Sequence, residues 1–288
     1  MGIILPDWKL YSLELDNDGR DMGNYFQSRG YGIERVRPIE GNESLILNFC
    51  VPPKTIENII SDSVDSKEKV LALSSHGNYH HLTYGLCKRA DKLSEKYGYI
   101  HIDRHNDLFG AGDDKDAEEI HCGRFVRRLC HDTNVGKQGL RPDVLFIGTK
   151  VSLITGIMDP CAREFLFTGA LDTSYSDLFY PVEAHLDRLP DDVYLTVDLD
   201  VLAPGEVRTA FDRGNMKAER LYEIVRMVKA RKNIISADVV GYSNSDLPMS
   251  AYDCKKNQFG GIRDEEEPSF EKSMKVYENL VRIIKGGI

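Results

Sequence analysis

Short apolar runs alternate along the chain with segments whose apolar residues recur at helical spacing. The helical segments are 53–63, which Pro53 can start, 82–97, which Gly98 can end, 221–228 and 270–284. The apolar runs have the length and β-branched content of buried strands. They lie at 45–49, 69–75, 99–103, 144–148, 164–168, 193–199 and 234–242.

Strands that alternate with helices predict a parallel sheet covered by helices on both faces. No Pro- or Ser-rich linker interrupts the pattern, and no internal repeat is visible. We therefore expect a single α/β domain over 1–288, with three α/β/α layers and a doubly wound, mainly parallel sheet. Long connections at 104–124, 201–216 and 243–267 follow predicted strands, and connections of this length are usually functional.

Charge and hydropathy exclude two classes of partner. The formal net charge is −9, which argues against nucleic acid but not against a cationic substrate. No apolar run approaches the length that a membrane span needs, so we expect no membrane partner. The six cysteines lack Cys-x-x-Cys spacing and no signal peptide is recognised, which favours a cytoplasmic protein with reduced thiols.

Aspartate and histidine side chains gather where the predicted strands end. Parallel strands bring their carboxyl ends to one edge of the sheet, which is where such sheets bind ligands. Residues two apart in a strand face the same way, so Asp103 with His105, and Asp198 with Asp200, each offer two ligands to one side. Four converging carboxylates repel one another unless cations lie between them, and their number suits two divalent ions. The candidate ligands are His80, Asp103, His105, Asp107, Asp198 and Asp200.

These segments resemble motifs of the arginase/agmatinase/formiminoglutamase superfamily, the ureohydrolases. The family's Gly-Gly-Asp-His-Ser is similar to Gly-Asn-Tyr-His-His at 77–81, and its Asp-Ala-His-x-Asp to Asp-Arg-His-Asn-Asp at 103–107. Its Ser-x-Asp-x-Asp-x-x-Asp-Pro is similar to 196–204, where Ala203 replaces the last Asp. The resemblance spans about 70–285 and leaves 1–65 poorly matched.

The resemblance implies an arginase-like fold with two Mn²⁺ per chain, and oxygen-rich ligands suit this metal. It also implies hydrolysis of a C–N bond in a guanidino or amidino group, and a possible homo-oligomer. The implied ligands are Asp103 and Asp198 as bridging carboxylates, His80 and Asp107 at one ion, and His105 and Asp200 at the other.

One of the candidate metal ligands, Asp107, and one of two neighbouring loop residues are candidates for proton transfer. In the family's mechanism Asp107 would accept a proton from the attacking water and relay it to the leaving amine. The family's catalytic His-Gly aligns with Cys122-Gly123, while His121 lies one position earlier. Either His121 replaces the family histidine after a local shift, or Cys122 carries the proton, or Cys122 is an ordinary loop thiol.

The substrate pocket departs from the family at one position. Many relatives grip the guanidinium with a Glu where this chain has Gly241, which we expect to remove bulk from the pocket floor. Asp246 and Glu206 are candidates to bind a cationic substrate instead. The acidic run 113–119 would suit a peptide of basic character.

The leading hypothesis is therefore a binuclear manganese hydrolase that releases urea from an arginine-like group, possibly an arginine side chain within a peptide, which would become ornithine. The partner would be a small molecule or peptide carrying that group. One alternative is an amide hydrolase or deacetylase on the same fold, which would use one zinc ion. Another is a metal-binding regulatory protein without turnover.

Overall fold

The computed structural model describes most of the chain in seven longer segments and one short strand. None of the helices in these segments is long and apolar enough to cross a membrane. The described residues are 8–37, 51–64, 67–108, 119–135, 143–149, 170–171, 182–244 and 267–286.

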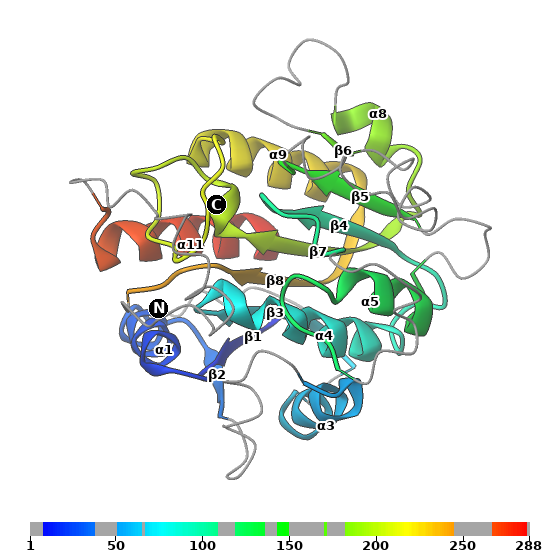
Figure 1. The fold of residues 1–288 in the computed structure, drawn as a ribbon, viewed down its shortest axis with the longest axis horizontal. Helices are drawn as coiled ribbons and strands as arrows, with labels where there is room; N and C mark the ends of the chain where they lie inside the picture. The colour runs from blue at the N-terminus through cyan, green and yellow to red at the C-terminus, as the bar shows by residue number, and fades with distance from the viewer. Residues whose placement is uncertain are drawn as a thin grey trace.

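The described strands form one eight-stranded sheet in the order β2-β1-β3-β8-β7-β4-β5-β6, in which every neighbouring pair is parallel. This confirms the predicted α/β class with a parallel sheet (Figure 1). That all of 1–288 forms one domain stays a prediction. The strands are β1 (Trp8–Leu13), β2 (Ile33–Val36), β3 (Lys69–Ser74), β4 (Gly98–Ile102), β5 (Val144–Ile147), β6 (Ala170–Leu171), β7 (Asp192–Asp198) and β8 (Asn233–Val240).

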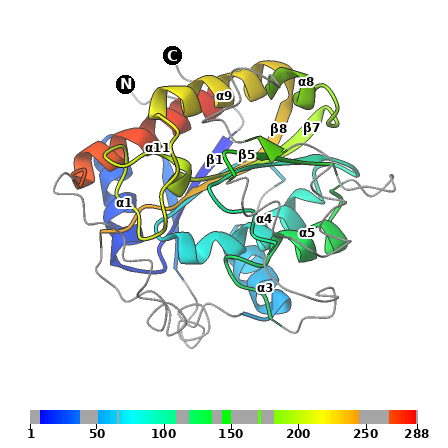
Figure 2. The same cartoon turned by 45° about the horizontal axis from the view of Figure 1, so that its top comes forward.

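Helices cover both faces of the sheet and make three layers, as Figure 2 shows. One apolar cluster joins the sheet to α1 (Asn17–Ser28), α8 (Val182–Leu186), α9 (Ala218–Arg231) and α11 (Phe270–Lys285). A second cluster joins the opposite face to α3 (Pro53–Ser63), α4 (Thr83–Ala90) and α5 (Val126–Asp132).

Alternation within the strands produces the two clusters. In β3, Leu71 and Leu73 belong to the first cluster, whereas Val70 and Ala72 belong to the second. Successive side chains of a strand point to opposite faces, so a strand covered on both sides must be apolar at nearly every position. This explains why the central strands read as continuous apolar runs.

Five of the predicted strands correspond to β3, β4, β5, β7 and β8, within two residues at their ends. The predicted strands at 45–49 and 164–168 lie outside the described residues. The predicted helix over 82–97 was wrong in its extent. A 3₁₀ turn, η1 (Gly77–Leu82), precedes α4, and α4 ends at Ala90.

The early end of α4 has a physical cause in the side chain of Tyr97. Its hydroxyl donates to the carbonyl of Cys87 over 2.9 Å and lies 3.1 Å from Oδ1 of Asp91. Tyr97 therefore packs back on the last turn of α4 instead of extending it, and Gly98 begins β4.

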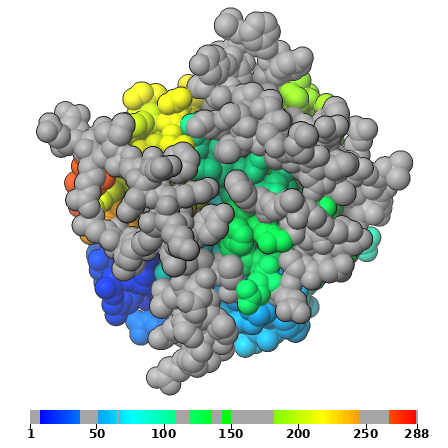
Figure 3. Space-filling model, in the orientation of Figure 1, coloured from blue at the N-terminus to red at the C-terminus, as the bar shows by residue number. Residues whose placement is uncertain are grey.

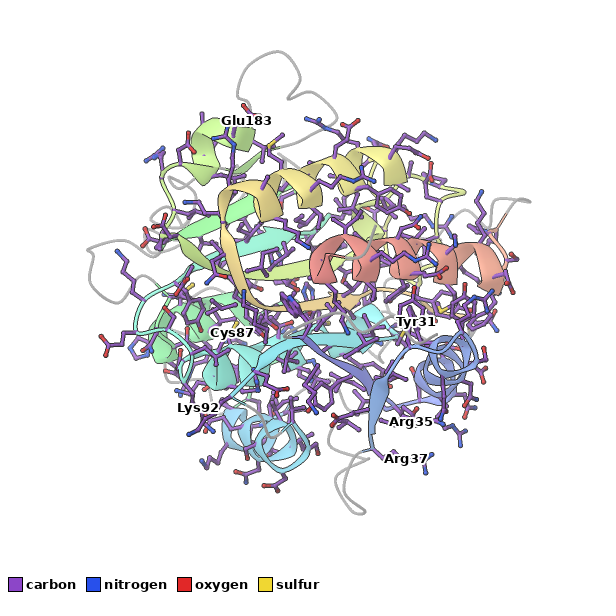
Figure 4. The ribbon with its side chains drawn as sticks, turned by 180° about the vertical axis from the view of Figure 1, so that it is seen from behind. Tyr31, Arg35, Arg37, Cys87, Lys92 and Glu183 are labelled. Carbon is purple, nitrogen blue, oxygen red and sulfur yellow. The ribbon has the colours of Figure 1, made fainter. Side chains whose placement is uncertain are left out.

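Elements in the N-terminal region were not predicted. Here β1 pairs with β3, and Asp16 caps α1 by accepting a 2.7 Å hydrogen bond from the backbone N–H of Gly19. At the outer edge, β2 and the residue after it carry Arg35 and Arg37, labelled in Figure 4. Both guanidinium groups pair with the buried Glu14, and charged side chains of this kind discourage further strand pairing.

Candidate metal centre

Four neighbouring strands, β3, β8, β7 and β4, direct the candidate ligands to one edge of the sheet. His80 lies in η1 after β3, and Asp103 to Asp107 follow β4. Asp198 is the last residue of β7, and η4 (Leu199–Val201) carries Asp200. The six predicted ligands therefore meet at the carboxyl ends of central strands, as the pattern indicated.

The first set of ligands surrounds a single ring nitrogen. Nδ1 of His80 lies 3.1 Å from Oδ2 of Asp103, 3.0 Å from Oδ2 of Asp107 and 3.4 Å from Oδ2 of Asp198. All four residues are buried. We call His80, Asp103, Asp107 and Asp198 the inner group.

A second set shares Asp103 with the first. Nδ1 of His105 lies 2.8 Å from Oδ2 of Asp200 and 3.6 Å from Oδ1 of Asp103. The side chain of His105 is 32% exposed, whereas that of His80 is 2% exposed. We call His105, Asp103 and Asp200 the outer group, and Asp103 offers one carboxylate oxygen to each group.

Backbone amides hold these carboxylates in place. The N–H of His105 donates to Oδ1 of Asp103 over 2.6 Å, and the N–H of Asp200 donates to Oδ1 of Asp198 over 3.0 Å. The N–H of Arg104 donates to Oδ1 of Asp200 over 3.1 Å. Each donor is fixed by the chain itself, so the carboxylates are oriented before any ion binds.

Asp107 has an unusual backbone conformation. Its φ is 49°, in the left-handed region that non-glycine residues rarely occupy. Such conformations persist where the surroundings impose them and are concentrated at functional sites. Here the turn brings Oδ2 of Asp107 next to His80.

A chain of hydrogen bonds behind His80 fixes its tautomer. The hydroxyl of Thr196 donates to Oδ2 of Asp238 over 3.0 Å, so its oxygen accepts from Nε2–H of His80 at 2.9 Å. In the neutral ring, which is the form that binds metal, Nδ1 of His80 then carries a lone pair directed at the inner group. Carboxylates often orient metal-binding histidines in this way. The role of Asp238 was not predicted from the sequence.

Crowding of buried carboxylates alters their protonation. Burial, together with the charge of Asp103, raises the pKa of Asp200 to about 7. Burial and the charges of Asp200 and Asp103 raise the pKa of Asp198 well above its usual range. Burial opposes charging of His80, but the carboxylates of Asp103 and Asp107 raise its pKa well above the ordinary value. The metal-free cluster thus reduces its repulsion by retaining protons, which divalent cations would displace.

His101 is a member of the cluster that sequence reasoning missed. Its Nε2 lies 3.2 Å from Oδ2 of Asp103 and 3.7 Å from Oδ2 of Asp107. The available signal was the alternation of β4, which places Tyr99 and His101 on one face just before Asp103.

The donors in this cluster fit divalent cations. Ligand atoms of His80, His101, Asp103 and Asp107 lie within 4.8 Å of one another, as do those of Asp103, His105 and Asp200. Oδ2 of Asp107 and Nε2 of His101 are buried without a hydrogen-bond partner. Buried polar atoms are normally paired, so both observations favour a cation among them.

Gly241 occupies a position where no side chain fits. Its φ is +117°, and a Cβ there would collide with Oδ1 of Asp198 and lie 2.7 Å from the backbone N of Leu199. We expected that its missing side chain would widen the pocket floor, and this was wrong. The space is filled by Asp198 and Leu199, so the family's Glu cannot be accommodated on this backbone.

The connection 201–216 folds back over the outer group. The N–H of Gly214 donates to the carbonyl of Asp200 over 2.6 Å. The ring of Phe211 lies 6.2 Å from that of His105 and 5.6 Å from that of His76, between ring centroids. Phe211 is partly exposed, so this side of the centre has an aromatic rim.

The candidate proton carriers lie in the turn before α5. Nδ1 of His121 accepts a 3.2 Å hydrogen bond from the N–H of Gly123, and His121 and Cys122 are both partly buried. Phe125, which follows, packs its ring 4.9 Å from that of His80 and so holds the turn beside the inner group. Green residues of this turn and of α5 reach the surface in Figure 3. The roles of His121 and Cys122 stay predictions.

The roles of Glu206 and Asp246 in binding a cationic substrate stay predictions. Oε1 of Glu206 pairs with Nζ of Lys217 at 3.2 Å, so its carboxylate already has a cationic partner. Asp246 lies outside the described residues, as does all of the acidic run 113–119 except Glu119.

Solved structures of other proteins share this fold. The chain resembles the structures of arginase from Bacillus subtilis (17% identity, 97% of each chain covered, TM-score 0.61) and a hypothetical agmatinase from Burkholderia thailandensis (15% identity, 97% of this chain and 85% of that chain covered, TM-score 0.64). It also resembles agmatine ureohydrolase of Thermoplasma volcanium (13% identity, 98% and 89% covered, TM-score 0.59).

At these identities the structural likeness shows the fold alone. A search of curated protein sequences finds no match. The model of the Arginase family matches residues 39–246, which include all six predicted ligands. The chain belongs to the arginase family.

Proposed function

We propose that this chain is a binuclear manganese hydrolase that cleaves a C–N bond of a guanidino group and releases urea. The observation that carries the proposal is the sharing of Asp103 between the inner and outer groups. A carboxylate with one oxygen toward each group suits two ions held close together, as in two-metal hydrolytic sites. The oxygen-rich outer group suits Mn²⁺.

The residues of the chain have separate tasks in this reaction. A pair of divalent cations would supply the charge that polarises the guanidino carbon and makes water a nucleophile near neutral pH. Asp107, held by its left-handed turn, would accept the proton of the attacking water and pass it to the leaving amine. Water adds to the carbon as the C–N bond breaks, which gives urea and an amine.

The preferred substrate in this proposal is an arginine embedded in a peptide rather than free arginine. Gly241 offers no carboxylate to the guanidinium, and its backbone leaves no room for one. A substrate that loses a local contact can recover binding energy through remote contacts. The connection 201–216, with Phe211 near His105, provides a surface for such contacts. An acidic run at 113–119 would favour a peptide of basic character.

The test is detection of urea from purified protein with Mn²⁺. Free arginine, agmatine and peptides with an internal arginine are compared by kcat/KM, and Asp103→Asn serves as the inactive control. We expect the highest kcat/KM with the peptides. Faster turnover of free arginine would contradict the peptide preference, but the proposal that the protein releases urea would stand. Acetate release from N-acetyl substrates, with one zinc per chain, would favour the deacetylase alternative instead.

A further inference from the structure

His101 is a fully buried histidine in the centre of the sheet. Its Nδ1 lies 3.1 Å from the hydroxyl of Tyr99. Its ring is parallel to that of His80, with centroids 5.2 Å apart and an interplanar angle of 5°. The edge of Phe146 packs against the ring at 5.4 Å. The imidazole is thus held on three sides, and its free nitrogen, Nε2, faces the inner group.

Nε2 of His101 is close to two carboxylates but hydrogen-bonds to neither. It lies 3.2 Å from Oδ2 of Asp103 and 3.7 Å from Oδ2 of Asp107, yet it has no hydrogen-bond partner. A ring N–H is directional and must point at its acceptor. The distance to Asp103 would allow a hydrogen bond, so the bond is absent because the N–H would not point at the carboxylate oxygen. A proton on Nε2 would therefore be buried without a partner.

The other tautomer leaves no unpaired hydrogen on the imidazole ring of His101. Nδ1–H of His101 donates to the oxygen of Tyr99, and Nε2 carries a lone pair. That lone pair then faces Oδ2 of Asp103 and Oδ2 of Asp107. A nitrogen lone pair and carboxylate oxygens repel one another at these distances unless a cation lies between them. A similar lone pair, on Nδ1 of His80, faces the same two oxygens.

The spacing of these atoms matches a coordination shell. Ligands bound at about 2.1 Å from one ion lie roughly 3.0–3.4 Å apart in octahedral or tetrahedral geometry. Oδ2 of Asp103 is 3.1 Å from Nδ1 of His80 and 3.2 Å from Nε2 of His101. Oδ2 of Asp107 is 3.0 Å and 3.7 Å from the same nitrogens. Three of the four spacings fall in this range, and the fourth exceeds it by a few tenths of an ångström.

We propose that Nε2 of His101 is an additional nitrogen ligand of the ion held by the inner group. This inner ion would have two imidazoles, whereas the outer ion would have only that of His105. Imidazole-rich sites favour Zn²⁺, Co²⁺ and Ni²⁺ relative to Mn²⁺. The two positions would then differ in metal preference, and the inner one would exchange its ion less readily. The inference rests on the two-ion centre of the proposed function but not on its substrate.

The direct test counts the imidazoles that bind metal. Protein labelled with ¹⁵N-histidine is loaded with ¹¹³Cd²⁺, and ring nitrogens that show one-bond ¹¹³Cd–¹⁵N coupling are counted by nuclear magnetic resonance. We expect coupling at three histidines in the wild-type protein, namely His80, His101 and His105. Coupling at only two would overturn the role of His101 without any variant being needed.

Variants assign the third nitrogen. His101→Asn is expected to lose one coupled nitrogen, whereas His131→Gln, which alters an exposed histidine of α5, is expected to keep all three. Retention of three couplings in His101→Asn would contradict the inference. Circular dichroism checks that the variant is folded.

Affinity provides a second readout, independent of turnover. Calorimetric titration with Co²⁺ should show that His101→Asn weakens the tighter of two binding events by at least ~10-fold, because a ligand is lost, and leaves the weaker one within about twofold. Equal weakening of both events would indicate general damage and count against the proposal. Failure of the wild-type protein to bind Cd²⁺ or Co²⁺ would overturn both the role of His101 and the proposed function. Binding with ¹¹³Cd–¹⁵N coupling at only two histidines would overturn the role of His101 alone.

Discussion

The inner and outer groups use similar residues but differ in how firmly the protein holds them. His80 is buried and its far nitrogen is fixed through Thr196 and Asp238, while the ring of His105 is 32% exposed and lies beside the partly exposed Phe211. A buried, hydrogen-bonded ligand is rigid and excludes water, whereas an exposed one can adjust to a substrate. The inner group is thus suited to retaining an ion, and the outer group to the side from which substrate approaches.

Removing Asp103, which the inner and outer groups share, should abolish the difference between their two ion positions. Asp103→Ala is expected to lose both ions and all detectable urea release, because Asp103 faces both His80 and His105. His105→Asn should lose only the weaker ion. Elemental analysis after dialysis measures both. If Asp103→Ala kept one ion tightly bound, the two groups would not depend on a common carboxylate.

Proton transfer should depend on the turn before α5, which lies beside the inner group. His121→Ala is expected to lower kcat by ~10²–10⁴-fold if His121 replaces the family histidine, and Cys122→Ala should lower it much less. The turn that carries both is anchored by Phe125 against His80. Steady-state kinetics with saturating Mn²⁺ decides the ranking. The reverse order would assign the proton to the thiol.

The hydrogen bonds behind His80 should matter for the inner group only. Thr196→Val keeps the shape of the side chain but removes the hydroxyl that links His80 to Asp238. We expect a ~10–100-fold weaker inner ion and an unchanged outer ion. Thr83→Val is a matched control, because Thr83 also donates to Asp238, at 2.9 Å, and has no role in the proposed link. Equal effects in calorimetry would show that Asp238, rather than its link to His80, determines affinity.

The smallest expected effect is on stability as a function of pH. The pKa of Asp200 rises from 3.8 to about 7 on folding, so the folded protein holds a proton that the unfolded chain releases. The free energy of unfolding of metal-free protein should therefore fall as pH rises from about 4 through 7. His80 and His105 act in the same direction above pH 6.5, because contacts with carboxylates raise each pKa despite burial.

Added metal should reverse this trend, because cations replace the protons. At pH 8, Mn²⁺ at about 100 times its Kd should raise Tm by roughly 5–10 °C, and by less at pH 5.5. Scanning calorimetry with and without a chelator measures both. A stabilisation that is constant across this range would show that the cluster does not hold extra protons.

The sequence was sufficient to predict the central strands and the meeting of six acidic and histidine side chains at their ends, because both follow from the apolar runs; that these side chains bind metal stays a prediction. Asp103 and His105 directly follow the apolar run of β4, so the end of a parallel strand brings both to the edge of the sheet. The alternation of β4 places His101 on the face that leads to Asp103, but alternation alone does not identify a ligand. A histidine within a strand is usually part of the core, and its role depends on the position of His80, which follows a different strand.

Gly241 was misinterpreted for a related reason. The resemblance to the family shows which side chain is missing but not the backbone conformation at that position. Its positive φ and the nearness of Asp198 are properties of three-dimensional packing. The first strand and helix were missed because no family motif covers them, although Asp16 followed by Gly19 is compatible with a helix start.

The position of β8 has a consequence for biosynthesis. This strand comprises residues 233–240 but lies between β3 and β7, so the two sides of the metal centre cannot be joined until most of the chain has left the ribosome. Until then β3 and β7 each present an unpaired edge of apolar strand, which is prone to association with other chains. Nascent chains that stall before residue 233 should therefore be the form of this protein that most needs chaperones.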